Sequence, residues 1–460
     1  MSAVNPRSIT DHVLALIEDT DADQHWSELA SRALVDTVAV LLAGAGDPSV
    51  RAVAASIGES GGDARSLATG TAMSPRSAAL VDGTSAHALD YDDVDDAVIA
   101  HPSAVLVPAL LAASSTQDVT GAELAAAFRT GVRVGRAIAA AIDIRSHYEL
   151  GWHSTATIGT IGATAAVAQL LRLTIDQARH ALGIAGSLAG GSRRAFGTMT
   201  KPLHAGLAAG NSLLATQLAV NGLTSDPDLI GSPLGFLELH SERRGTAVPS
   251  FADAPIDEPA LNVKLFPCCY YTHSAAEAAL SLSTDSVGHN GIEQVTVIVQ
   301  PGGLAPLLHR RPTDGSQAKF SMEYVVAAAL LDGRIDLSTF SDDRVARVDV
   351  QQLLTRVEVA EAPTPPIGPP SPEGPFAAVV IRKGDGTTAQ NRVDRPAGHA
   401  SRPVTDEQLH RKFDDCTAFA DPSARHHVHQ ELRNLRNQLS IRQLIDQVCQ
   451  LSQSRFGGSI

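Results

Sequence analysis

The sequence predicts a mainly α-helical protein, in which a large all-helical domain carries a smaller α+β domain. Apolar residues recur at helical spacing from about residue 8 to residue 222. Alternating, strand-like segments occur only after about residue 266, and helical spacing returns over residues 406–452. The chain is therefore expected to leave the helical domain once and to return to it at the end.

This change of pattern sets the predicted domain boundaries. Residues 1–265 and 405–460 are assigned to the all-helical domain, and residues 266–404 to the α+β domain. With 460 residues, the chain is longer than one hydrophobic core usually serves, so a division into domains is expected on length as well.

Helix-ending glycines, a helix cap and small residues support the helical interpretation. The apolar positions of 29–41 stop at a glycine pair, Gly44 and Gly46, and Thr174 before Ile175-Asp176-Gln177 is typical of an N-cap. The segment from Gly159 to Ala166 places glycine and alanine on its inner face. Such residues let helix backbones approach closely, which predicts a compact helical domain.

The α+β domain is predicted from three strands and one helix. Segments 292–300, 355–359 and 377–383 read as strands, and segment 320–331 reads as a helix. Residues 362–375 are rich in proline, so this segment is expected to form neither a helix nor an inner strand.

Composition limits the classes of partner and the location. The net charge of −14 is spread along the chain, so neither nucleic acid nor an anionic membrane surface is expected as a partner. No signal or membrane-spanning segment is evident, and the cysteines do not show the spacing of a zinc or iron–sulfur site. These features favour a cytoplasmic protein.

Two segments hold candidate acid/base residues. Residues 87–103 contain five aspartates, among them Asp90, and then His101. This pattern fits a solvated acidic loop, an acid/base site or a metal site, and the residues alone leave all three open. His153 begins a predicted helix, where the helix dipole favours the neutral imidazole that a general base needs, although a core histidine would look the same.

The segment TKPLHAG, residues 200–206, begins another predicted helix with a cation at its start. The proline after Lys201 is expected to hold that lysine in an extended conformation. A cation is electrostatically unfavourable at a helix start, and this favours a functional role for Lys201. His204 is expected to be either a partner in the site or a core residue.

Four further residues are candidates for binding a substrate. Arg193 and Arg194 can each clamp a carboxylate, but solvated surface charge is the alternative interpretation. Lys264 and His273 flank the predicted domain boundary, and clefts between domains commonly hold small molecules.

Five motifs, taken in order, resemble the MmgE/PrpD family. They are HALDYDD with a following HPS, GWHSTATIGTIGA, TKPLHAG, KLFPCC with a following TH, and AKFSMEYVVAAALLDG. The resemblance implies an all-helical domain built from both chain ends, a smaller α+β lid, and a homodimer. It also implies a small di- or tricarboxylate substrate, with a proton leaving or joining a carbon next to a carboxylate without metal or cofactor.

The resemblance also assigns residues. Similarity to cis-aconitate decarboxylase marks five positions: Asp90, His101, His153, Lys201 and Lys264. Similarity to iminodisuccinate epimerase makes Tyr148 and Lys201 an opposed acid/base pair. In the leading interpretation, that of a lyase, His153 or Lys201 takes the proton, Lys264 and an arginine hold carboxylates, and His101, oriented by Asp90, assists the leaving group.

One departure bears on the reaction. Val94 stands where the decarboxylase has a threonine, and the spacing from Asp90 to His101 differs by a residue. The leading expectation is therefore a dehydratase of the 2-methylcitrate dehydratase type. Epimerisation and decarboxylation are the alternatives within the family, and a non-catalytic binding protein is the alternative outside it.

Overall fold

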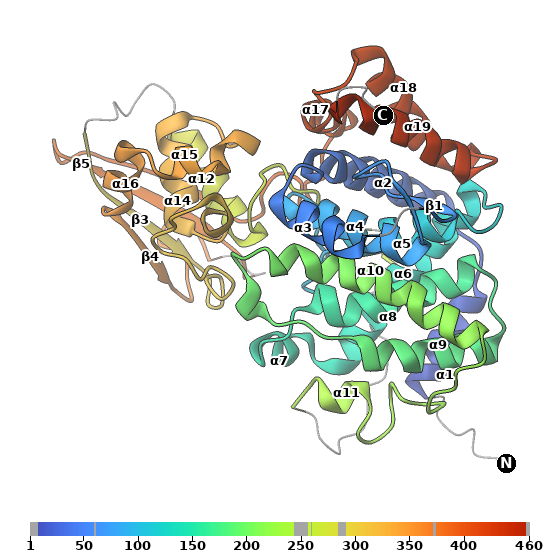
Figure 1. Ribbon diagram of the computed structural model, residues 1–460. Helices are drawn as coiled ribbons and strands as arrows, with labels where there is room; N and C mark the ends of the chain where they lie inside the picture. Colours follow the sequence, from blue (N-terminus) through green and yellow to red (C-terminus); the bar gives the residue numbers. More distant parts are fainter. Residues whose placement is uncertain are drawn as a thin grey trace.

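The computed structural model describes residues 8–58, 61–242, 256–258, 260–283, 291–370 and 374–456. Within this part of the chain the protein is mainly α-helical, with a smaller α+β domain, as predicted (Figure 1). The two parts lie side by side, and the helices of both chain ends gather in the larger part.

The helical part contains the elements from both ends of the chain. The helices of its N-terminal segment are α1 (Ile9–Glu18), α2 (Gln24–Gly44), α3 (Pro48–Ile57), α4 (Pro75–Ala88), α5 (Pro102–Ala113), α6 (Gly121–Ile142), α7 (Ile144–Glu149), α8 (Ser154–Leu170), α9 (Ile175–Leu188), α10 (Thr200–Val220) and α11 (Phe236–Leu239). A short hairpin, β1 (Ala64–Arg65) and β2 (Ala72–Met73), precedes α4. The C-terminal helices are α17 (Asp406–Cys416), α18 (Pro422–Arg433) and α19 (Ile441–Gln453).

One hydrophobic core joins the two ends of the chain. Leu409 and Phe413 of α17 and Val428 of α18 are buried in the same cluster as Leu34 of α2 and Leu110 of α5. The C-terminal helices therefore complete the core of the helical domain.

The α+β domain is built on a four-stranded sheet in the order β4-β3-β5-β6. Its strands are β3 (Ile292–Val299), β4 (Val357–Glu361), β5 (Ala377–Lys383) and β6 (Thr388–Val393). Strand β4 is parallel to β3, whereas β5 is antiparallel to both β3 and β6. Its helices are α12 (His273–Ser283), α13 (Gly315–Ala318), α14 (Met322–Asp332), α15 (Asp342–Val345) and α16 (Val348–Leu354).

Most predicted elements are present, and the described residues also form elements that were not predicted, among them the β1–β2 hairpin, the helices α12, α13, α15 and α16, and strand β6. Strand β6 was not predicted, because its sequence TAQNRV lacks the apolar alternation of a half-buried strand and most of its side chains are partly exposed. The backbone at Lys201 is helical rather than extended, since α10 begins at Thr200. The Lys201 N–H donates to the Thr198 carbonyl at 3.1 Å, and the missing N–H of Pro202 costs nothing in a first turn.

Glycine allows the helix contact that positions the site. A Cβ atom on Gly83 of α4 would lie 2.9 Å from the Cα atom of Gly206 in α10, and one on Gly206 would lie 2.3 Å from the Leu80 carbonyl oxygen. The helices run antiparallel, with Arg76 near Gly210 and Gly83 near Gly206. The C-terminal end of α4 therefore meets the N-terminal end of α10.

No single helix among the described residues has the length and apolarity of a membrane span. Helices α2 and α3 pass such a test only as a pair, bent by 85° at their junction.

Candidate active site

The antiparallel contact of α4 and α10 brings His87 to Lys201. His87 lies one turn after Gly83, and Lys201 lies one turn and a half before Gly206. The Lys201 Nζ and His87 Nε2 atoms are 2.7 Å apart, and both side chains are buried. Lys201 was among the predicted site residues, whereas His87 was not.

Asp90 is the common partner of two buried lysines. Its Oδ1 atom lies 2.6 Å from Lys201 Nζ and 3.2 Å from Lys264 Nζ. Lys264 also donates to the Asp90 carbonyl oxygen at 2.8 Å, which holds a residue whose φ of 53° is left-handed. Burial by itself would raise the pKa of Asp90, but the two ammonium groups outweigh it and hold this pKa well below the usual value.

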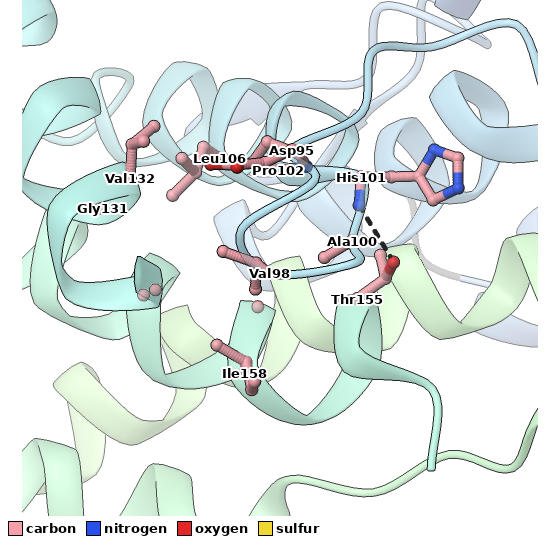
Figure 2. A pocket seen from close by; sticks show the side chains of 13 residues that line it. Asp95, Val98, Ala100, His101, Pro102, Leu106, Gly131, Val132, Thr155 and Ile158 are labelled. Carbon is pink, nitrogen blue, oxygen red and sulfur yellow. Dashed lines mark hydrogen bonds between the residues drawn. The ribbon is translucent and has the colours of Figure 1, made fainter. Parts of the chain in front are cut away.

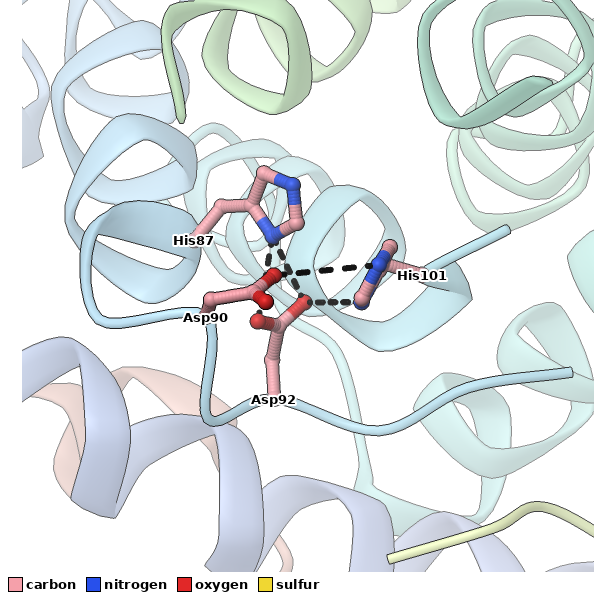
Figure 3. A group of neighbouring side chains, drawn as sticks. All are labelled: His87, Asp90, Asp92 and His101. Carbon is pink, nitrogen blue, oxygen red and sulfur yellow. Dashed lines mark hydrogen bonds and ion pairs between the residues drawn. The ribbon is translucent and has the colours of Figure 1, made fainter. Parts of the chain in front are cut away.

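Asp92 orients two histidines (Figure 3). Its carboxylate lies 2.9 Å from His87 Nδ1 and 3.0 Å from His101 Nδ1. The His87 Nδ1 atom donates to Asp92, and the Nε2 atom of His87 is left to accept from Lys201, whereas the His101 Nδ1 atom lies beside the same carboxylate without the geometry of a hydrogen bond. His101 was expected to be oriented by Asp90, but their side chains are 4.0 Å apart, so Asp92 performs this role.

The histidines of this cluster are neutral. Burial lowers the pKa of His87 to about 3, although the Asp92 carboxylate opposes the shift. Burial also lowers the pKa of His101. Neutral imidazoles beside protonated lysines offer both proton acceptors and proton donors in one place.

His153 and His204 form a second histidine pair across α8 and α10. Their Nδ1 atoms are 3.0 Å apart, and the His153 ring is 6.0 Å from the His87 ring, between centroids. The Phe196 ring meets His153 edge-on at 5.0 Å. Burial, followed by the charge of Lys201, lowers the pKa of His153 well below its usual value and that of His204 to about 4.

Tyr148 and Arg193 pair with one another. The Arg193 guanidinium lies 3.6 Å above the centre of the Tyr148 ring and donates to the carbonyl oxygens of Tyr148 and Ala305. Burial raises the pKa of Tyr148 far above its usual value. Arg194 is exposed, and its backbone N–H donates to Ser192 Oγ.

His273 lies at the start of α12, in the α+β domain. Its Nε2 atom donates to the Cys268 carbonyl at 3.3 Å, and its ring packs against Phe266 and Tyr270. Burial lowers its pKa to about 3. The structure thus places His273 among aromatic side chains rather than against Asp90.

A small cavity lies behind His101 (Figure 2). Its volume is about 20 Å³, and its walls are formed mainly by apolar and small residues, with Val98, Val132 and Ile158 among them. The His101 ring points away from this space. A cavity of this size holds about one water molecule, so it is not a substrate pocket.

The residue types around Asp90 also fit a metal site. Ligand atoms of His87, Asp90, Asp92 and His101 all lie within 4.8 Å of one another. However, the ammonium groups of Lys201 and Lys264 already supply two positive charges to Asp90. A metal ion there would have to displace them, so the donor set fits lysine–aspartate pairing better than metal binding.

Two residues of the site were missed by sequence reasoning. His87 and Asp92 lie in the same HALDYDD motif as Asp90, and the motif was treated as one acidic segment. The available signal was a histidine at the end of a predicted helix, directly before a cluster of aspartates that could pair with it. Lys319, buried in the second domain, was also missed.

Fold and site together define a class of protein. A mainly helical scaffold surrounds a buried cluster of lysines, neutral histidines and carboxylates, which are the groups that acid/base chemistry on an anion requires. The chain belongs to the MmgE/PrpD family. Residues 8–248 match the MmgE/PrpD N-terminal domain, and residues 266–438 match the MmgE/PrpD C-terminal domain.

Curated relatives of the chain are enzymes. It is 32% identical over 360 residues to a cis-aconitate decarboxylase of Mus musculus, covering 74% of this chain and 71% of the relative. The cis-aconitate decarboxylase of Homo sapiens is 30% identical over 352 residues, with 74% and 72% covered. A cis-aconitate decarboxylase of Aspergillus terreus is 27% identical over 422 residues, with 84% of each chain covered.

Proposed function

We propose that this protein is a lyase that needs no cofactor and decarboxylates a small unsaturated tricarboxylate of the cis-aconitate type. The observation that carries the proposal is Lys201, a buried ammonium held between the Asp90 carboxylate and the His87 imidazole. The names of the curated relatives support the same substrate class.

The proposed reaction loses carbon dioxide and gains one proton. The bond from a carboxylate to its carbon breaks, carbon dioxide leaves, and the electron pair stays on carbon, delocalised toward a neighbouring carboxylate. Lys201 then delivers a proton to carbon and recovers it from solvent. Cations and donors that are already in place stabilise the negative charge as it develops.

The remaining residues hold the substrate and its charge. Asp92 fixes the ring of His101, so its Nε2 atom faces the space beside Asp90. His153 meets this space from the start of α8, paired with His204. We assign Lys264 to the support of Asp90, because its ammonium bonds both the main chain and the side chain of that residue.

Tyr148 is assigned a structural role in this proposal. Its raised pKa keeps the phenol protonated, and Arg193 covers its ring. A phenolate base for epimerisation would require the loss of a proton that burial strongly opposes.

Dehydration is the second candidate, and Val94 favours it. Val94 is buried, and its backbone forms both hydrogen bonds of a bridge with Asn262, at 2.9 and 2.8 Å. The fixed backbone leaves a methyl-bearing side chain at a position where the decarboxylase resemblance expects a hydroxyl. A dehydratase would use the same lysine and histidines to remove a proton and assist the loss of hydroxide.

The test uses NMR in D₂O with cis-aconitate, citrate and 2-methylcitrate, and with malate- and iminodisuccinate-type dicarboxylates for epimerisation. Decarboxylation of cis-aconitate gives an unsaturated dicarboxylate that carries deuterium from solvent, together with carbon dioxide. Dehydration gives an unsaturated tricarboxylate from citrate or 2-methylcitrate. Lys201→Met serves as the matched control, since it keeps the volume of the side chain and removes the ammonium.

Each result has a defined meaning. Turnover of cis-aconitate that disappears in Lys201→Met supports the main proposal, whereas turnover of 2-methylcitrate alone replaces it with dehydration. Deuterium uptake by a dicarboxylate without a new alkene would contradict both and indicate an epimerase. We also propose a cytoplasmic homodimer, which light scattering after size-exclusion chromatography and cell fractionation would check.

A further inference from the structure

Lysine is rare in this chain, and most of it is buried. The sequence has five lysines. Lys201, Lys264, Lys319 and Lys412 are buried, and Lys383 at the end of β5 is partly exposed. Lysine is seldom buried unless its charge is paired, so each buried lysine calls for an identified partner.

Three of the four buried lysines have a carboxylate partner. Lys201 and Lys264 share Asp90, and Lys412 lies 2.6 Å from Asp36. Lys319 differs from them, because no acidic group lies within 4.0 Å of its ammonium in the described part of the chain. Its Nζ atom donates to the Ala88 carbonyl oxygen at 3.0 Å, which leaves donor capacity for other acceptors.

Lys319 reaches from the α+β domain to the site in the helical domain. It follows α13, and its own carbonyl accepts the Cys269 N–H at 2.9 Å. Its neighbour Phe320 lies in contact range of the Lys201 ammonium, 5.2 Å from ring centre to Nζ. Ala88, which Lys319 contacts, is the last residue of α4 and stands two residues before Asp90.

The charges around Lys319 fit an anion. Burial lowers the pKa of Lys319, while the charges of Asp47 and Asp90 oppose this shift and those of Lys201 and Lys264 add to it. Lys201, Lys264 and Lys319 lie near the ionised carboxylates of Asp90 and Asp92 and among neutral histidines, and Asp47 is a third carboxylate near Lys319. Lys319 nevertheless lacks a carboxylate at ion-pair distance in the described part of the chain, and a bound carboxylate would be that partner.

We propose that Lys319 binds one carboxylate of the substrate from the α+β domain, so that a tricarboxylate joins this domain to the Lys201 site. The inference rests on the proposed function only for the substrate class. It makes Lys319 a specificity-determining residue: the enzyme distinguishes a tri-acid from a di-acid by whether this ammonium finds a partner.

The experiment measures binding rather than turnover. Isothermal titration calorimetry compares tricarballylate, a saturated tricarboxylate, with glutarate and methylsuccinate, which each lack one of its carboxylates. These three ligands are titrated into the wild type, Lys319→Met and Lys319→Arg. Lys383→Met, a substitution in the same domain, is the matched control.

We expect the wild type to prefer tricarballylate over each di-acid. In Lys319→Met, affinity for tricarballylate should fall about ten- to a hundred-fold, the usual effect of losing a charged hydrogen bond. One of the two di-acids lacks the carboxylate that Lys319 binds, and the affinity of Lys319→Met for this di-acid should be almost that of the wild type. Lys319→Arg should keep most of the preference, and Lys383→Met should match the wild type.

Other outcomes overturn the inference. If Lys319→Met loses the same affinity for all three ligands, Lys319 acts through its contact with Ala88. If the affinities of Lys319→Met equal those of the wild type, Lys319 has no role in ligand binding. Absence of tricarballylate binding to the wild type would also reject it. If the predicted pattern appears but cis-aconitate is not turned over, the proposed function fails and the role of Lys319 stands.

Discussion

Two buried lysine–aspartate pairs in this protein have the same N–O distance, but the pKa of the aspartate is shifted in opposite directions. Lys201 and Asp90 are 2.6 Å apart, and so are Lys412 and Asp36. Asp90 has a second lysine, and its pKa is lowered, whereas burial raises the pKa of Asp36 because Lys412 alone does not offset it. The charged neighbours of a pair, rather than its N–O distance, should therefore decide how much stability is lost when one partner is removed.

The second pair supports the first. Lys412 of α17 donates to the carbonyl oxygens of Tyr91 and Lys264, at 2.7 and 2.9 Å. These bonds hold both the segment after Asp90 and the segment that carries Lys264. The C-terminal helices thus contribute to the site by fixing its backbone.

The largest expected effect is on turnover in Lys201→Met. Loss of the proposed proton donor should lower kcat by about 10²- to 10⁴-fold. The free energy of unfolding should change much less, because Asp90 keeps Lys264 as a cation. Steady-state kinetics and thermal unfolding measure the two quantities. If Lys201→Met is unfolded at room temperature, Lys201 has a structural role. The Lys201–Asp90 pair would then not differ from the Lys412–Asp36 pair in its contribution to stability.

Lys412→Met should show the converse. Removing this lysine leaves Asp36 buried without a cation, which typically costs about 3–5 kcal/mol of the free energy of unfolding. The double variant Lys412→Met/Asp36→Leu should recover much of this loss. Urea unfolding measures the stabilities, and kcat of the folded fraction should stay within about tenfold of the wild type, by contrast with Lys201→Met. A stable single variant would show that the pair is dispensable.

The fold was predictable because it rests on local patterns. The helical spacing of the N-terminal segment, the cap at Thr174 and strands β3 and β5 are all confirmed. Strand β6 was missed because its pairing with β5 is tertiary and its own sequence does not alternate. The assignment of domain boundaries at 265 and 404 stays a prediction.

The site was predictable only in part, for a different reason. Motifs identified Asp90, Lys201 and Lys264, but no pattern in the sequence says that one aspartate is shared by two lysines. The Asp92 carboxylate lies nearer to His101 than that of Asp90, at 3.0 against 4.0 Å, and the sequence alone does not distinguish two aspartates two residues apart. The catalytic roles of all these residues remain proposals.

A smaller effect is expected from pH, and it concerns stability. Burial lowers the folded-state pKa values of five histidines to about 3 or 4, from about 6.5 when unfolded: His87, His147, His204, His273 and His429. The unfolded chain therefore binds more protons, so stability is complete above pH 6.5 and is lost as the pH falls toward 4.

Two buried carboxyls act in the opposite direction. Burial raises the pKa of Asp93 to about 8 and that of Asp82 to about 6, so between pH 4 and these values the folded state holds a proton that the unfolded state lacks. These five histidines outnumber the two carboxyls, so the net stability should fall by roughly 1–3 kcal/mol per pH unit between pH 6 and pH 4. Urea titrations across this range measure the slope. A stability that is flat or rises toward pH 4 would contradict the neutral histidines.

The smallest expected effect is that of metal removal, and it tests what neutralises Asp90. If Lys201 and Lys264 supply its positive charge, dialysis against EDTA should leave kcat and the melting temperature unchanged within about twofold and about 1 °C. Added Zn²⁺ should inhibit rather than activate, because it would compete with the two ammonium groups for Asp90 and Asp92. Metal content by mass spectrometry, measured before and after dialysis, provides the control. If EDTA abolishes turnover and a divalent ion restores it, Asp90 is a metal ligand. The Lys201–Asp90 pair could then no longer be compared with the Lys412–Asp36 pair.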